Sequence, residues 1–189
     1  ITFREGDVNQ LPFDDDAFDW VWSADCVGYA PMEPLPLIEE LARVVKPGGS
    51  VALLAWSSEK LLPGHPVLEA RLEATTAGIA PFVADRPPES HFLRALGWFR
   101  DAGLEECTAH TFVRTAHAPL TEDIYCGLED LFKMRWPGVE AELVQQGAGG
   151  EHLLAEYRRL CLPESPDFIL CQPDYCSFFT YTMFRGRVT

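Results

Sequence analysis

The feature that most constrains the fold is a strand, a helix and a second strand within residues 18–56. Residues 18–23 form a nearly continuous β-prone run, typical of a strand buried on both faces of a parallel sheet. Residues 37–45 repeat apolar side chains at helical spacing, and Pro47-Gly48-Gly49 forbids the helix to continue. Residues 50–56 are again apolar and β-prone. This order predicts a right-handed βαβ unit and therefore an α/β fold.

Weaker patterns predict the elements around this unit. Residues 1–6 indicate a short strand, and the proline and aspartates of 8–17 indicate a solvated loop. Residues 57–88 are irregular apart from a helix over 67–76, which is typical of a lid or binding loop. The remaining predicted elements are helices over 91–102, 122–132 and 151–162, a loose segment over 145–150, a strand over 107–115 and a closing antiparallel strand over 177–188.

The charge of the chain argues against polyanionic partners. Fifteen Lys and Arg stand against 29 Asp and Glu, which gives a net charge of −14. Residues 1–40 hold ten acids and one base, Arg4, so their rim suits a cationic or neutral ligand. We therefore expect no nucleic acid or membrane as partner. No apolar run is long enough to span a bilayer, which predicts a cytoplasmic protein.

The six cysteines are too sparse for a disulfide scaffold, and none form a C-x-x-C pair. We expect reduced thiols. Their spacing matches no common zinc pattern, so we predict no metal site.

Two segments together resemble a known family. They read Gly6-Asp7-Val8-Asn9-Gln10-Leu11-Pro12-Phe13-Asp14-Asp15-Asp16-Ala17-Phe18-Asp19-Trp20-Val21 and Leu41-Ala42-Arg43-Val44-Val45-Lys46-Pro47-Gly48-Gly49. They are similar to the motifs that follow the cofactor loop in class I S-adenosylmethionine-dependent methyltransferases, in particular the small-molecule group, type 11-like, that includes quinone-biosynthesis enzymes. The likeness continues through residues 91–104 and covers roughly residues 1–115, with the closing strand.

The resemblance implies a fold and also a gap in it. It implies a Rossmann-like doubly wound sheet of strand order 3-2-1-4-5-7-6 with an antiparallel last strand. Residues 1–6 would then be the third strand, so the first two strands and the glycine-rich cofactor loop would precede this sequence. Without them, the apolar edge and faces of the central strands would be exposed. We predict a partial single methyltransferase domain over residues 1–189, with a helical substrate-side insertion over 116–170.

By the same resemblance, the cofactor is S-adenosylmethionine. Asp7 would accept a hydrogen bond from the adenine amino group, the Val8 backbone N–H would meet a ring nitrogen, and the adjacent Asn9 would also bind the cofactor. Ser23 and Ala24 would lie under the methionine portion, with Cys26 beside them. We interpret Asp19 and Asp25 as surface or turn acids, and the alternative for Asp7 is a turn cap.

Residues on the acceptor side are less constrained. Tyr29 follows the strand end and would face the acceptor, and Trp56 ends the next strand. His65 and His91 flank the predicted lid and are the better placed histidines for a general base, although each can equally be structural. Tyr125 and Trp136, with the other aromatics of the insertion, would line an apolar or aromatic pocket, or simply form helix-packing core. No catalytic residue is assigned.

The sequence thus predicts methyl transfer from S-adenosylmethionine to a small molecule. The alternative is a methyltransferase-like module that has lost catalysis and acts in binding or assembly. A weaker alternative is metalloid methylation, because Cys26 follows the strand where arsenite methyltransferases also carry a cysteine. A homodimer is one option for its assembly.

Overall fold

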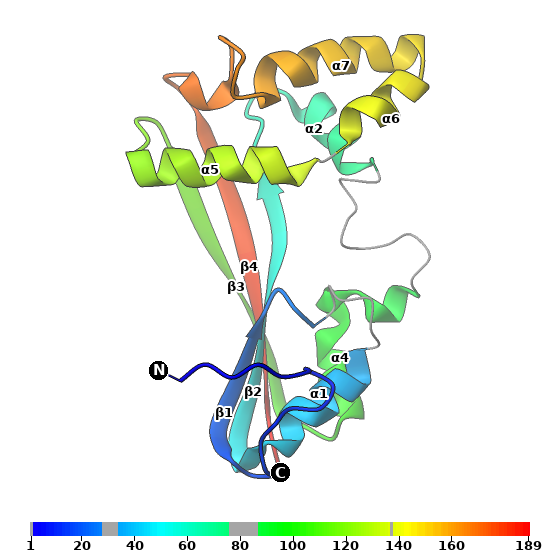
Figure 1. Ribbon diagram of the computed structural model, residues 1–189, viewed down its shortest axis with the longest axis vertical. Helices are drawn as coiled ribbons and strands as arrows, with labels where there is room; N and C mark the ends of the chain where they lie inside the picture. Colours follow the sequence, from blue (N-terminus) through cyan, green and yellow to red (C-terminus); the bar gives the residue numbers. More distant parts are fainter. Residues whose placement is uncertain (1, 28–33, 76–86, 137) are drawn as a thin grey trace. The chain divides into compact units, whose positions relative to one another are not determined.

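The computed structural model describes residues 2–27, 34–75, 87–136 and 138–189. They form an α/β structure with a four-stranded mixed sheet of order β1-β2-β4-β3 (Figure 1). The strands are β1 (Phe18–Ala24), β2 (Val45–Lys60), β3 (Glu105–His117) and β4 (Cys176–Arg187). The described order corresponds to 4-5-7-6 of the predicted sheet, so the α/β fold class is confirmed.

Helices connect these strands along the chain. In chain order they are α1 (Pro34–Arg43), α2 (Pro66–Glu73), α4 (Ala95–Asp101), α5 (Glu122–Arg135), α6 (Val139–Gln145) and α7 (Ala148–Cys161), with 3₁₀ turns η1 (Pro88–Ser90), η2 (Phe92–Arg94) and η3 (Ile169–Cys171). No helix among the described residues is both long and apolar enough to cross a membrane.

The described chain divides into two compact units. The first contains Ile1–Ser58, Asp85–Val113 and Thr180–Thr189, and the second contains Glu59–Ala84 and Arg114–Phe179. The insertion predicted over 116–170 falls within the second unit. Our assignment of a single domain over 1–189 stays a prediction.

The βαβ unit of the first compact unit forms as predicted. Strand β1 pairs with β2 in parallel, with Trp20 opposite Ser50 and Ala24 opposite Leu54. Helix α1 begins at Pro34, whose fixed φ and missing N–H suit a first turn. Its apolar stripe, Leu37, Ile38 and Leu41, is buried and packs with α4 on one face of the sheet (Figure 1). Each such side chain contributes roughly 1.5–3 kcal/mol relative to an exposed one.

The Pro47-Gly48-Gly49 segment lies inside β2, where we had expected a turn between helix and strand. The β1–β2 register shifts between Phe18 and Trp20, because β2 carries extra residues there. Gly48 adopts φ 83°, and a Cβ on Gly49 would lie 2.4 Å from the Asp19 carbonyl oxygen. The glycines therefore allow the two strands to approach closely, and β2 continues to Lys60, beyond the predicted end at 56.

Strand β4 runs antiparallel to both neighbours within the first unit. Gly48 N–H donates to Val188 O at 2.8 Å, whereas Ser57 Oγ donates to Thr180 O at 3.1 Å. On the other side, the Thr111 and Thr182 hydroxyls are 3.0 Å apart and Arg187 Nη1 lies 2.8 Å from Glu106 Oε1. The predicted antiparallel closing strand is thus confirmed.

Three sequence-based expectations need correction. The described residues 2–6 are exposed and form no strand, because a strand needs a hydrogen-bonded neighbour. Strand β1 is not buried on both faces, since Trp20 and Trp22 are 62% and 55% exposed. That exposure is what we expected for central strands without their first neighbours. Of the segment over 145–150 that we expected to be loose, Gln145 ends α6, residues 146–147 form a turn and residues 148–150 begin α7, and α6 itself was not predicted.

The second unit has its own core. Leu72 of α2, Phe132 of α5, Leu143 of α6 and Leu160 of α7 are almost completely buried in it together with Tyr175. Helix α6 packs on α7, and α2 also contacts α7.

Candidate functional site

The loop before β1 carries Asp7 in a tight turn. Asp7 Oδ1 accepts the Asn9 backbone N–H at 2.9 Å and Asn9 Nδ2–H at 2.7 Å, and Gln10 N–H donates to Asp7 O at 3.0 Å. The Asn9 backbone bond, followed by the side-chain bond, lowers the pKa of the exposed Asp7 carboxyl. Both bonds end on Oδ1, so Oδ2 is the oxygen that can accept a hydrogen bond from a ligand. Val8 beside it is half-buried.

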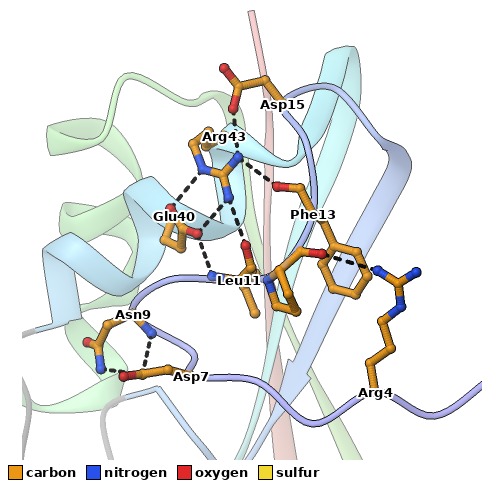
Figure 2. A network of polar contacts seen from close by, with 9 residues as sticks. Arg4, Asp7, Asn9, Leu11, Phe13, Asp15, Glu40 and Arg43 are labelled. Atoms are coloured by element: carbon orange, nitrogen blue, oxygen red, sulfur yellow. Dashed lines mark hydrogen bonds and ion pairs between the residues drawn. The ribbon is translucent and has the colours of Figure 1, made fainter.

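An ionic anchor fixes this loop to α1 (Figure 2). Glu40 Oε1 accepts Leu11 N–H at 2.7 Å, and the Glu40 carboxylate also binds the Arg43 guanidinium. Arg43 donates to the Phe13 carbonyl at 2.9 Å, to the Leu11 carbonyl at 3.2 Å and to Asp15 Oδ1 at 2.6 Å. The hydrogen bonds from Arg43, ahead of the Leu11 bond, lower the pKa of Glu40. The anchor therefore holds the chain that follows Asp7 and Asn9.

The other end of the anchored loop leads into β1. The Phe13 ring packs edge-on against the Phe18 ring with centroids 4.9 Å apart, and Arg4 lies over Phe13 at 5.4 Å. Arg4 also donates to the Pro12 carbonyl. The loop thus connects Asp7 to the strand whose other end carries Ser23.

Strand β1 ends at Ala24, opposite Leu54, while its parallel partner β2 continues to Lys60. Ser23 is half-buried opposite Leu53, Ala24 is exposed opposite Leu54, and Cys26 is half-buried just beyond. In α/β proteins ligands bind outside such strand ends. The methionine portion of the cofactor at this strand end stays a prediction.

Asp25 occupies the turn between Ala24 and Cys26 in a left-handed conformation, with φ 48°. Its N–H donates to Leu54 O at 2.9 Å, and its Oδ1 accepts Trp56 N–H at 2.8 Å. The Trp56 ring packs against Tyr181 of β4 with centroids 5.4 Å apart. Asp25 thus joins the end of β1 to β2.

Of the remaining predicted acceptor-side residues, Tyr29 lies outside the described residues, and the other three lie in the second unit. In the second unit, His65 Nδ1 is 4.0 Å from Glu156 Oε1, and the Tyr125 hydroxyl is 3.7 Å from Cys171 Sγ. Trp136 is buried in that unit's core against Phe132, and its Nε1 has no hydrogen-bond partner among the described residues. The first unit therefore collects Asp7, Val8, Asn9, Ser23, Ala24, Cys26 and Trp56, whereas the second contains His65, Tyr125 and Trp136.

Three further predictions concern the pair Asp7 and Ser23, the histidine His91 and the metal site. Asp7 and Ser23 share the first unit, but their joint use by one ligand stays a prediction. His91 Nδ1 accepts Leu93 N–H at 3.2 Å at the start of η2, and burial lowers the pKa of this histidine. His91 thus has a local capping role. Among the described residues, no cluster of three or more His, Cys, Asp or Glu is placed to hold a metal ion.

The sequence analysis missed the anchor and the Asp25 contacts. Glu40 and Arg43 are three residues apart on a helix, a spacing that signals an ion pair but not its contacts with residues 11–15. Tyr181 was expected only as part of the closing strand, and its approach to Trp56 depends on the pairing of β2 with β4.

Comparisons find proteins that are similar to parts of this chain. Residues 1–53 match the family described as methyltransferase domain. Protein Rv1405c of Mycobacterium tuberculosis is 35% identical over 91 residues, which cover 48% of this chain and 30% of that protein. The 27-O-demethylrifamycin SV methyltransferase of Amycolatopsis mediterranei is 31% identical over 108 residues, covering 56% of this chain and 36% of the enzyme.

The chain spans about a third of the length of these relatives. Among solved structures, the YcgJ protein of Bacillus subtilis aligns with 98% of this chain and 70% of its own, at a TM-score of 0.43 and 17% identity. The resemblance to the methyltransferases is thus confirmed over residues 1–53 by the family match.

Proposed function

We propose that this chain is part of an enzyme that transfers a methyl group from S-adenosylmethionine to a small molecule. The observation that carries the proposal is the family match over residues 1–53, which contain both Asp7 and the end of β1. The rifamycin methyltransferase among the relatives supports a small-molecule acceptor by its name.

The residues of the first unit fit the cofactor by their chemistry. Asp7 offers an ionised, exposed carboxylate as acceptor for the adenine amino group, and Val8 N–H and Asn9 lie next to it. Ser23, Ala24 and Cys26 would contact the methionine portion at the strand ends. When bound, the cofactor would supply a methyl group on a cationic sulfonium.

The chain's own residues would act by binding and orientation. Methyl transfer is an in-line displacement, so holding the acceptor near the methyl carbon and excluding water supplies much of the acceleration. Trp56, which lies within β2, offers a half-buried aromatic side chain in the first unit, whereas Trp136 is buried in the core of the second unit and packs there. We propose an apolar or aromatic acceptor.

Calorimetric titration of the intact protein with S-adenosylhomocysteine tests the proposal. We expect micromolar binding, weakened about tenfold by Asp7→Asn, because the charge-assisted bond to the adenine amino group becomes a neutral one. Asp14→Asn is the matched control, since Asp14 is an exposed acid of the same loop, and it should leave affinity unchanged. Absence of binding by the unaltered protein would contradict the proposal and favour a module without catalysis.

A further inference from the structure

Asp25 presents a fixed carboxylate just past the end of β1, beside Leu54 and Trp56 of β2. Its side chain is exposed, although its N–H bonds Leu54 O and its Oδ1 accepts Trp56 N–H. The backbone is held at φ 48°, a conformation that costs free energy for a residue other than glycine. Two hydrogen bonds to the β2 backbone therefore determine where this carboxylate lies.

Two aromatic rings lie beside the carboxylate. Trp56 lies within β2, two residues beyond the last pair with β1, and its ring contacts Tyr181 edge-on at 5.4 Å, with 66° between the planes. Both side chains are half-buried, so part of each ring is accessible. The Tyr181 phenol is next to Asp25: its pKa is raised to about 12, first by burial and then by the charge of Asp25 and a hydrogen bond with it. Carboxylate and rings thus converge at one place.

No cationic side chain neutralises this carboxylate within the described ranges. Asp15 pairs with Arg43 and Asp19 pairs with Lys46, whereas Asp25, like Asp14 and Asp16, forms no ion pair with a described residue. The net charge of −14 adds to the negative potential that a cation would meet there.

We propose that Asp25, Trp56 and Tyr181 form a binding site for a protonated amine, carried on the apolar or aromatic methyl acceptor. An ammonium group donates hydrogen bonds to a carboxylate, and aromatic rings attract it through their negative faces. Our sequence interpretation of Asp25 as a turn acid accounts for its left-handed turn but not for the aromatic rings of Trp56 and Tyr181 next to it. This inference rests on the proposed function, and it concerns the anchoring of the ammonium group, not the atom that receives the methyl group.

The test compares benzylamine with benzyl alcohol, which has similar size and no charge at neutral pH. Titration of the intact protein followed by NMR should show tighter binding of benzylamine. Asp25→Asn should weaken benzylamine binding about tenfold and leave benzyl alcohol unchanged, because only the charged hydrogen bond is lost. Asparagine also tolerates a positive φ and can still accept Trp56 N–H, so the turn should persist.

Asp16→Asn is the matched control, because Asp16 is another exposed aspartate at positive φ, 57°, in the same unit. It should leave benzylamine affinity unchanged. Tyr181→Leu should weaken benzylamine binding about three- to fivefold through the lost ring, whereas Tyr181→Phe should keep most of it. Circular dichroism would verify that each variant is folded.

Binding of S-adenosylhomocysteine to the same preparations separates this inference from the proposed function. If benzylamine binds no better than benzyl alcohol, or if Asp25→Asn behaves as the unaltered protein does, the amine site is refuted even where the nucleoside binds. If the amine binds through Asp25 but S-adenosylhomocysteine does not bind, the methyl-transfer function fails and the cation site stands.

Discussion

Arg43 connects helix α1 to the loop that follows Asp7 through several hydrogen bonds. Its guanidinium makes five hydrogen bonds, to the Glu40 carboxylate, to the Asp15 carboxylate and to two loop carbonyls (Figure 2). A planar fork of donors can satisfy all of these acceptors at once, whereas an ammonium group cannot. The precise placement of the Asp7 turn therefore depends on arginine at this position.

Arg43→Lys should weaken S-adenosylhomocysteine binding several-fold and lower the thermal midpoint by a few degrees, because lysine keeps the charge but loses the contacts with the loop carbonyls. Calorimetric titration and thermal denaturation measure the two effects. A merely structural role predicts a lower midpoint with full affinity at a temperature where the variant is folded. Arg158→Lys is the control, since Arg158 makes a single exposed pair with Glu140, and it should change neither quantity.

At the scale of elements, the sequence predicted the helices and strands that a local apolar pattern determines. Helix α1 and strands β1, β2 and β4 follow from periodicity and from Pro34 at the start of α1, although Pro47-Gly48-Gly49 lies within β2 and does not precede it. The expected strand over 1–6 failed because pairing requires a neighbour, which local sequence does not supply. Helix α6 was missed because its local pattern is weak and a loose segment was expected over 145–150, whereas packing against α7 stabilises the helix.

The candidate site likewise contains residues that the sequence could predict and contacts that it could not. Asp7, Ser23 and Cys26 could be named because they stand in motifs of continuous sequence. The contacts of Asp25 with Trp56, and of Trp56 with Tyr181, join residues far apart in the chain. They depend on the register of β1 with β2 and of β2 with β4, which one sequence does not reveal.

Gly49 sets the spacing of the two parallel strands. A Cβ there would meet Asp19 O at 2.4 Å and Val45 Cγ1 at 2.6 Å, so Gly49→Ala should destabilise the protein by about 1–3 kcal/mol. Gly97→Ala is the matched control: Gly97 lies inside α4 with no atom within 4 Å of an added Cβ, and alanine should stabilise that helix by about 0.5–1 kcal/mol. Urea denaturation gives both values, and equal effects of the two substitutions would contradict the close approach.

At the scale of the whole molecule, the net charge of −14 should itself lower stability, because like charges repel more strongly in the compact state than in the unfolded chain. The repulsion is not shared equally among the acids. Asp14 is exposed and makes no ion pair with any residue that the structure describes, whereas Asp19 binds Lys46 at 2.9 Å. Removing one charge or the other should therefore have different consequences.

Asp14→Asn should raise the thermal midpoint by roughly 1 °C at low ionic strength, since it removes repulsion without breaking a pair. Asp19→Asn removes the same charge but also the attraction to Lys46, so it should leave the midpoint unchanged or lower it. Salt near 0.15 M, with a Debye length of about 8 Å, should reduce the difference between the variants. Thermal scans at two ionic strengths provide the measurement. If the two variants shift the midpoint equally, and salt does not alter the shifts, long-range repulsion does not limit the stability of this protein.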